Sequence, residues 1–190
     1  MSVQKIIIVG DKNVDKDSFK DKLMNLQRDS NVSTSNRFLS WTINQQQLKV
    51  EFKIVEPDEL SAVRDSFYRS ANGFICVFNV NDNQSLATVE KMRERILAVR
   101  SQTRIILVGI KSNDNESKKL RKVTKKDAKR TAKSWKAEYF ETNVDGNQNI
   151  ENCLNVLMKA IIENKHTRLV SGRTSLKNTL DRFKYYNCFN

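Results

Sequence analysis

A short polar loop near the N-terminus carries the residues whose types and spacing point to chemistry. The apolar run Ile6-Ile7-Ile8-Val9-Gly10 leads into Asp11-Lys12-Asn13-Val14-Asp15-Lys16, and apolar positions at helical spacing begin at Phe19. A strand that enters a helix through the pattern G-x-x-x-x-G-K-[ST] holds phosphate groups with backbone N–H groups and a lysine. The stretch therefore predicts a phosphate-binding loop, in which Gly10 and Lys16 occupy two of the defining positions.

Two positions of this pattern carry different chemistry. Asp15 stands where the second glycine belongs, Asp17 stands where a magnesium-binding hydroxyl belongs, and Ser18 supplies a hydroxyl one residue later. A like charge about 4 Å from a phosphate costs about 1 kcal/mol in water and about 4 kcal/mol at a surface-like dielectric. The carboxylate of Asp17 suits magnesium, or it caps or complements the helix N-terminus. Lys16 is either a phosphate ligand or an ordinary solvated surface lysine.

The composition bounds the class of protein. The chain has 190 residues and 38% hydrophobic content, which predicts one soluble domain. It has no apolar run of membrane-spanning length and no basic-then-apolar N-terminal region, so we expect neither a membrane span nor a signal peptide. Three scattered cysteines indicate reduced thiols. His166 is the single histidine, so the sequence offers few residues for a histidine-based catalytic triad or metal cluster. We predict a cytoplasmic protein without catalytic residues of that kind.

The net charge of +12 is concentrated in two segments. Residues 116–136 contain ten Lys or Arg and two acids, and residues 165–190 contain six Lys or Arg and one acid. Such patches favour anionic partners. We expect an anionic membrane surface to be contacted through residues 118–136 and 173–189, giving peripheral membrane association, with nucleic acid less favoured. A solvated helix face and a disordered tail are the alternatives.

The chain divides into a domain at residues 1–165 and a basic C-terminal tail at residues 166–190. Apolar residues in the tail recur at spacings of four and three, which is typical of an interfacial amphipathic helix: Leu176, Leu180 and Phe183. Cys188 lies one residue late for a C-terminal lipidation signal, so acylation of Cys188 stays open.

Apolar runs and helical periodicity alternate along the domain. Strands are predicted at residues 4–9, 38–43, 48–55, 73–80, 104–110 and 139–142, and helices at residues 17–26, 60–70, 85–99, 124–135 and 150–162. Residues 44–47 connect the second and third strands as a hairpin loop. This order predicts an α/β fold with a doubly wound, six-stranded, mostly parallel sheet and one antiparallel edge strand.

Three further stretches, read in order, resemble the Ras superfamily of small GTPases and its Ras branch most closely. They are Leu60–Phe78, which is similar to the helix and strand after the second switch, Leu107–Asn113, which is similar to the strand ending in N-K-x-D, and Phe140–Asn143, which is similar to the E-T-S-A-K region. The resemblance covers residues 4–165 and implies a P-loop small-GTPase-like fold that binds GTP or GDP with magnesium.

The resemblance also assigns site residues. Nucleotide contacts are implied for Gly10, Lys16, Asp17, Ser18, Lys111, Asn113, Thr142 and Asn143. Asp17 and Thr34 are the metal-ligand candidates, and the family's partner-binding regions correspond to Phe38, Trp41, Leu60, Arg64 and Tyr68, although Trp41 is also explained by packing. No catalytic residue is assigned.

The family's chemistry is incomplete in this chain. No D-x-x-G occurs between residues 51 and 60, so the magnesium-shell aspartate and the γ-phosphate-sensing glycine are missing. Ile110 replaces the bracing asparagine, and Asn113 replaces the aspartate that pairs with guanine. We expect a pseudo-GTPase signalling or scaffolding module with weak or no GTP/GDP binding and no efficient hydrolysis. The alternatives are a divergent active GTPase switch, hence a GTP hydrolase, and a polyanion- or membrane-binding module.

Overall fold

The computed structural model describes residues 3–26, 37–111, 121–143 and 149–163. Its centre is a single six-stranded sheet in the order β2-β3-β1-β4-β5-β6. The strands are β1 (Val3–Gly10), β2 (Leu39–Ile43), β3 (Gln46–Val55), β4 (Gly73–Asn79), β5 (Arg104–Lys111) and β6 (Glu138–Asn143). Only the β2–β3 pair is antiparallel, so the predicted mostly parallel sheet with one antiparallel edge strand is confirmed.

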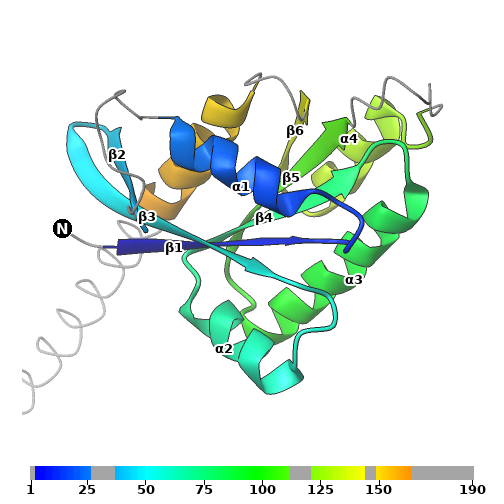
Figure 1. Ribbon diagram of the computed structural model, residues 1–190, viewed down its shortest axis with the longest axis horizontal. Coiled ribbons are helices and arrows are strands. Elements are labelled where there is room, and N and C mark those ends of the chain that lie inside the picture. Colours follow the sequence, from blue (N-terminus) through cyan, green and yellow to red (C-terminus); the bar gives the residue numbers. More distant parts are fainter. Residues whose placement is uncertain (1–2, 27–36, 112–120, 144–148, 164–190) are drawn as a thin grey trace, which may run out of the picture.

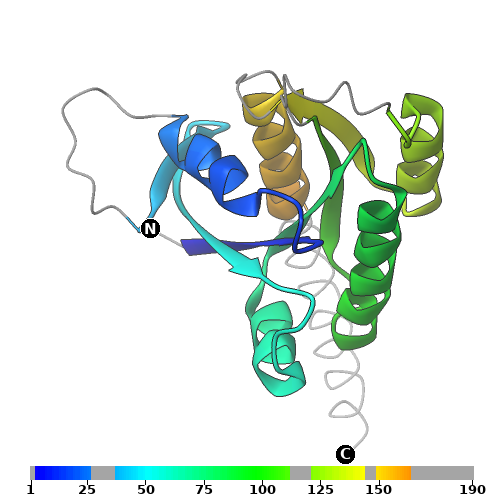
Figure 2. The same cartoon turned by 45° about the vertical axis from the view of Figure 1, so that its right-hand side comes forward.

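Helices cover both faces of this sheet (Figure 1). They are α1 (Lys16–Asn25), α2 (Ser61–Ser70), α3 (Asn83–Val99), α4 (Lys125–Ser134) and a helical segment at residues 150–163. Side chains of α1 and of residues 150–163 pack on one face, while those of α2, α3 and α4 pack on the other. Figure 2 shows the two layers on either side of the strands. Helices on both faces join the parallel strands, which makes the sheet doubly wound.

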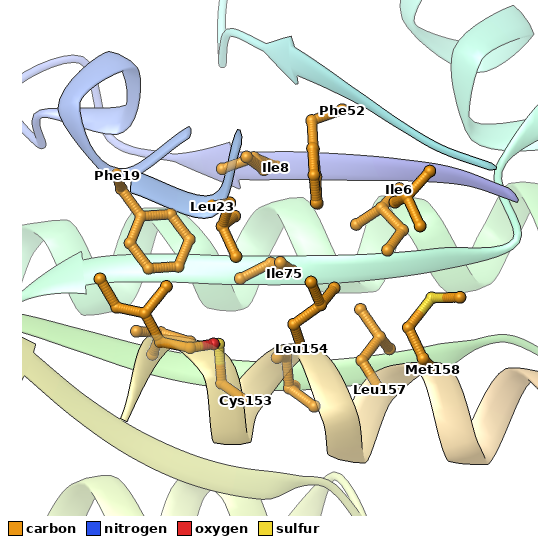
Figure 3. Packing of buried hydrophobic residues seen from close by; sticks show 14 of the residues in the cluster. Ile6, Ile8, Phe19, Leu23, Phe52, Ile75, Cys153, Leu154, Leu157 and Met158 are labelled. Atoms are coloured by element: carbon orange, nitrogen blue, oxygen red, sulfur yellow. The ribbon is translucent and has the colours of Figure 1, made fainter. Parts of the chain in front are cut away.

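Apolar residues on both faces of the central strands make the two cores. Ile6 and Ile8 of β1 face α1 and residues 150–163, whereas Ile7 and Val9 face α2 and α3. This alternation explains why the sequence of β1 is a continuous apolar run, as expected for a strand that is buried on both sides. In Figure 3, Leu23 of α1 and Leu154 lie next to Ile75 of β4, and Phe19 and Leu157 belong to the same core.

The hairpin between β2 and β3 is tighter than the sequence indicates. The predicted four-residue loop 44–47 is wrong, because Gln46 and Gln47 belong to β3 and pair with Ile43 and Thr42. The turn consists of Asn44 and Gln45, whose φ angles are 49° and 63°. Two-residue hairpin turns with positive φ at both positions match the twist of the flanking strands. Cross-strand pairing therefore extends β3 to Gln46, before the alternation of apolar and polar residues begins at Leu48.

This turn gives a test of the hairpin register. We expect Gln45→Gly to stabilise the protein by about 0.5–1 kcal/mol, because glycine adopts positive φ without the steric cost that glutamine carries. Urea unfolding measures the change. The matched variant Gln47→Gly should destabilise by a similar amount, because it places glycine inside β3. Stabilisation by Gln47→Gly instead would contradict the two-residue turn.

Candidate functional site

The predicted phosphate loop lies at the carboxyl end of the parallel sheet, between β1 and α1. Gly10 is the last residue of β1, and a Cβ atom there would lie 2.6 Å from the carbonyl oxygen of Val77 and 2.7 Å from its Cγ2. Since real Cβ atoms do not approach a backbone oxygen so closely, Gly10 is required for the contact between β1 and β4. The glycine at position 10 is thus explained by strand packing, without reference to a ligand.

Four backbone N–H groups of the loop and the first turn of α1 donate hydrogen bonds inside this segment. The N–H of Asn13 donates to Oδ1 of Asp11 at 3.0 Å, and the N–H of Val14 donates to the Asp11 carbonyl at 3.1 Å. The N–H of Lys16 donates to the Val14 carbonyl at 2.8 Å, and the N–H of Ser18 donates to Oδ1 of Asp15 at 2.9 Å. In a phosphate loop such groups point to the anion. Here they bond to the chain's own oxygen atoms.

The ammonium of Lys16 is buried and surrounded by oxygen atoms. Its Nζ lies 2.6 Å from the carbonyl oxygen of Asp11 and 3.4 Å from that of Val14. The carboxylate of Glu56, directly after β3, lies 3.1 Å from the same nitrogen. Lys16 is only 3% exposed, so it is not the solvated surface residue that the sequence left open. An ammonium removed from water in this way requires a neutralising charge, and Glu56 supplies it.

A second ion pair lies beside the first. Nζ of Lys12 is 2.6 Å from Oδ2 of Asp58, although both side chains are more than half exposed. The two pairs connect the phosphate loop with the segment that precedes α2. We call the set Lys12, Lys16, Glu56 and Asp58 the lysine clasp. The side chain of Arg64 donates to the carbonyl of Pro57 at 3.1 Å and holds the middle of that segment.

Asp15 and Asp11 carry fixed negative charge in the loop. Asp15 is the N-cap of α1, and hydrogen bonds from the side chain and backbone of Ser18 lower the pKa of its carboxyl group. The pKa of Asp11 is also lowered, first by the N–H of Asn13 and further by the hydroxyl of Thr88, which donates to Oδ2 at 2.8 Å. Both carboxylates are therefore ionised at neutral pH.

Asp17 lies in the first turn of α1, where a negative charge complements the helix dipole. Its side chain is exposed, and the capping alternative falls to Asp15 instead. Within the described ranges, no group of three or more His, Cys, Asp or Glu side chains is arranged to hold a metal ion. Thr34 lies outside the described residues. The metal assignment of Asp17 and Thr34 stays a prediction.

Glu141 organises the opposite end of the predicted site. Arg121 donates to Oε1 and Oε2 of Glu141 at 3.0 and 2.9 Å, and Tyr139 donates to Oε2 at 2.9 Å. Nζ of Lys111 is 3.1 Å from Oε1. Burial alone would raise the pKa of Glu141, but these donors outweigh it and lower the pKa to about 2. Lys111 thus has a carboxylate partner within the protein.

Two more of the predicted nucleotide-binding residues, Thr142 and Asn143, are the last residues of β6. Thr142 is buried, and Oδ1 of Asn143 is a buried oxygen without a hydrogen-bond partner in the structure. Asn113 lies outside the described residues. The structure therefore brings the Lys111 and Asn143 ends of β5 and β6 side by side, since these two residues pair in register. Asn143 keeps an unused acceptor where the resemblance predicts a base.

Three of the five residues predicted for the partner surface are buried. Trp41, Arg64 and Tyr68 are buried, with exposed fractions of 3%, 8% and 0%, so their side chains are not available on the surface. Trp41 faces the core from β2, and Tyr68 packs edge-on against Phe74. Amphipathic strands and helices also carry large residues on their inner faces, which is why sequence alone did not separate the two roles. Leu60 is 74% exposed.

Phe38, another residue of the predicted partner surface, is partly exposed. The guanidinium of Arg37 and the ammonium of Lys49 each lie 5.8 Å from its ring centroid. The prediction for Phe38 and Leu60 is thus compatible with their positions. Residues 118–120, residues 173–189 and Cys188 lie outside the described part of the chain, so the predicted membrane-facing surface stays a prediction there.

The strand order and the strand–loop–helix unit at residues 3–25 define a small-GTPase-type domain. A model of the Ras family matches residues 5–163, and this chain belongs to the Ras family. It is 32% identical over 120 residues to the Ras-related protein Ral-a of Drosophila melanogaster, covering 61% of this chain and 58% of that one.

Two more relatives support the same assignment. The Ras-like protein rasB of Dictyostelium discoideum is 29% identical over 133 residues, which is 69% of this chain and 66% of that one. The Ras-related protein Ral-B of Mus musculus is 29% identical over 122 residues, covering 63% and 59%. Each alignment spans less than two thirds of the relative's length. Among the helices in the described ranges, none combines the length and the apolarity needed to cross a bilayer.

The lysine clasp predicts energetic coupling between Lys16 and Glu56. In a double-mutant cycle of Lys16→Met and Glu56→Gln, urea unfolding should give a coupling energy of about 1–2 kcal/mol, because Glu56→Gln leaves the buried ammonium without a counter-charge only while Lys16 is present. The exposed pair Lys12→Met and Asp58→Asn is the matched control. It should show a smaller coupling that disappears at high salt. Equal coupling in the two cycles would contradict the buried arrangement of Lys16.

The Glu141 cluster predicts a dependence of stability on pH. Because the pKa of Glu141 falls from 4.5 to about 2 on folding, its contribution is fully present above pH 4.5 and is lost as the pH falls towards 2. Because Glu141 is only partly removed from solvent, which screens its ion pairs, the contribution is at most on the order of 3 kcal/mol. Glu141→Gln should therefore destabilise the protein at pH 7, with a difference from wild type that shrinks below pH 4.5. Glu138→Gln, an exposed change on the same strand, should leave the acid limb unchanged.

Proposed function

We propose that this protein is a pseudo-GTPase of the Ras family, a protein-binding module that is folded without a triphosphate or magnesium. The observation that carries the proposal is the 3.1 Å ion pair between Nζ of Lys16 and Glu56. In the family, that lysine holds the phosphates of the nucleotide. In this chain a carboxylate after β3 neutralises it. Nucleotide binding would have to break this pair and expose Glu56 to further negative charge.

Electrostatics supports the proposal beyond the single pair. The carboxylates of Asp11 and Asp15 stay ionised in the loop, and Glu56 faces the same space. Each like charge at about 4 Å opposes a phosphate by about 1–4 kcal/mol, depending on solvent access. The four N–H groups that donate inside the loop would also have to leave their present acceptors before binding phosphate. These costs add, and they predict nucleotide affinity that is weak or absent.

Hydrolysis is disfavoured separately from binding. The segment after β3 reads Glu56-Pro57-Asp58, without the D-x-x-G that holds the magnesium shell and senses the γ-phosphate. Pro57 has no N–H to donate. We therefore infer that the protein neither hydrolyses GTP efficiently nor switches between two nucleotide states.

Partner binding would use the surface beside the lysine clasp. Ras-family GTPases bind protein effectors, and in this chain Leu60 and Val63 are exposed apolar residues at the start of α2. The clasp holds the preceding segment through Glu56 and Asp58 with the protein's own lysines. We infer that this surface, together with Phe38, is presented constitutively to protein partners. A membrane contact through the basic segments is compatible with this role.

A second candidate function is a divergent nucleotide-binding switch. The buried and unpartnered Oδ1 of Asn143 favours it, because an unmet acceptor at the base end invites a donor from a ligand. In that case GTP or GDP would bind with Asp17 near the metal. The two candidates differ in whether the protein carries nucleotide when it is isolated.

The nucleotide content of purified protein separates the candidates. The protein is purified without added nucleotide, denatured, and the supernatant is analysed by anion-exchange chromatography. We expect far less than one equivalent of GDP plus GTP, because the Lys16 ammonium is already neutralised. Stoichiometric GDP or GTP would refute the pseudo-GTPase proposal and support the switch.

Restoring the loop pattern provides a gain-of-function test. Asp15→Gly together with Asp17→Ser recreates G-x-x-x-x-G-K-S and removes two carboxylates, and we expect affinity for a fluorescent GDP analogue with magnesium to rise at least about tenfold. Replacing an N-cap aspartate by glycine costs only a few tenths of a kcal/mol, so the fold should survive. Asp21→Ser, farther along α1, is the matched control and should change nothing. A restored loop that gains no affinity would show that the two acids are not what excludes the nucleotide.

A further inference from the structure

A groove of about 380 Å³ lies between α4 and β6, at the edge of the sheet opposite to β2. Figure 2 shows α4 next to this edge strand. Ala132 of α4 is buried, while Ala137, directly before β6, and Tyr139 are half-buried, so these side chains form an apolar floor. We call this site the α4–β6 groove. It shares no residue with the phosphate loop or with the lysine clasp.

The exposed residues around this groove carry an excess of positive charge. Lys129, Lys133 and Lys136 are exposed, and none of them forms an ion pair with another residue of the described ranges. Glu138 is the single carboxylate among the residues that line the groove, all of which are described. Uncompensated charges around a concave apolar surface favour a ligand of the opposite charge. The groove therefore complements an acidic partner.

Lys136 has a backbone conformation that a lysine adopts only at a cost, because its φ angle is 56°. It follows Trp135, the C-cap of α4, and its N–H donates to the carbonyl of Lys133 at 3.0 Å. The N–H of Ala137 donates to the carbonyl of Ala132 at 2.9 Å. In this pattern of helix termination, glycine is the usual residue at the position of Lys136. What lysine adds over glycine here is an ammonium group at the groove, and a costly conformation of this kind points to function.

The edge strand offers backbone groups beside the same groove. Within the described part of the chain, β5 is the only strand that pairs with β6. Near the end of β6, the side chain of Asn149 donates to the carbonyl of Glu141 at 2.8 Å. The groove borders the other end of the strand, at Glu138 and Tyr139. An extended segment of a partner can lie along such an edge and form main-chain hydrogen bonds with it.

From these observations we propose that the α4–β6 groove binds an extended acidic segment of a partner protein, whose carboxylates pair with Lys129, Lys133 and Lys136. A membrane surface fits this geometry less well, because a planar bilayer contacts exposed lysines of α4 without entering the groove beside β6. The proposal goes beyond the pseudo-GTPase function, since it concerns another edge of the sheet and does not depend on nucleotide content. Lys133 also complements the C-terminal end of α4, so binding must be tested directly.

The test is an NMR titration of the full-length protein, at constant ionic strength, with a synthetic decapeptide that alternates glutamate and valine. The alternation places the carboxylates on one face of an extended chain. Backbone signals of Lys133, Ala137 and Tyr139 should shift saturably with one midpoint, while those of β2 stay fixed. The same peptide with glutamine in place of glutamate should give no such shifts. An absence of saturable shifts with the acidic peptide, or equal shifts with the glutamine peptide, would overturn the proposal.

Substitutions locate the site. The double variant Lys129→Gln with Lys133→Gln should weaken peptide binding about tenfold, because it removes two charged contacts. Lys91→Gln with Lys159→Gln is the matched control, since it removes two charges from exposed positions of α3 and residues 150–163 that do not line the groove. The control should leave the affinity unchanged. Equal weakening by the two double variants would assign the binding to diffuse surface charge and refute the site.

Lys136→Gly should stabilise the fold and weaken the binding at the same time. Glycine adopts the φ angle of 56° without the steric cost, so the midpoint of urea unfolding should rise. Loss of the ammonium group should lower the affinity for the acidic peptide about threefold. A purely structural role of Lys136 would change the stability alone, so full retention of affinity by Lys136→Gly would contradict its place in the site.

Vesicles distinguish the acidic segment from a membrane. Sedimentation with phosphatidylserine vesicles is measured for wild type and for the double variant Lys129→Gln with Lys133→Gln. Peptide binding that this variant loses, together with vesicle binding that it keeps, would support the acidic segment as the occupant. Vesicle binding that it loses, without saturable peptide shifts in wild type, would assign these lysines to a membrane surface and refute the proposal.

Discussion

The charge on Lys16 is the constraint around which this structure is arranged. An ammonium with 3% exposure cannot remain without a counter-charge, because water no longer solvates it. Ras-type domains ordinarily solve this problem with a nucleotide phosphate. In this chain, Glu56 reaches the lysine from the end of the neighbouring parallel strand. The counter-charge is thus part of the polypeptide, and the loop and the segment after β3 are joined without a ligand.

Other features of the loop are consistent with that solution. Asp15 caps α1 in the position where a phosphate would otherwise accept from the helix N-terminus, and Asp11 accepts from Asn13 and Thr88. A helix N-terminus needs an acceptor, and either an anionic ligand or an aspartate can supply it. The two substitutions that damage the nucleotide pattern therefore do not damage the fold: one becomes a cap and the other complements the dipole of the same helix.

The sequence predicted the architecture well and the site only in part. Continuous apolar runs such as residues 4–9, and the helical spacing of Phe19 and Leu23, specify element type locally, so the order of strands and helices followed. The pairing of Lys16 with Glu56 was missed, because it depends on the register between β1 and β3, which lie far apart in sequence. The sequence signal was an acidic residue directly after the third strand. The ion pair between Arg121 and Glu141 was also missed, because it joins the segment before α4 to β6, twenty positions along the chain.

A crystal structure of the protein grown with excess GTP and magnesium tests the central claim most directly. We predict that Nζ of Lys16 remains paired with the Glu56 carboxylate at about the present 3.1 Å separation, with no triphosphate in the loop. A structure with phosphate oxygens on Lys16, magnesium beside them and Glu56 displaced towards solvent would contradict it.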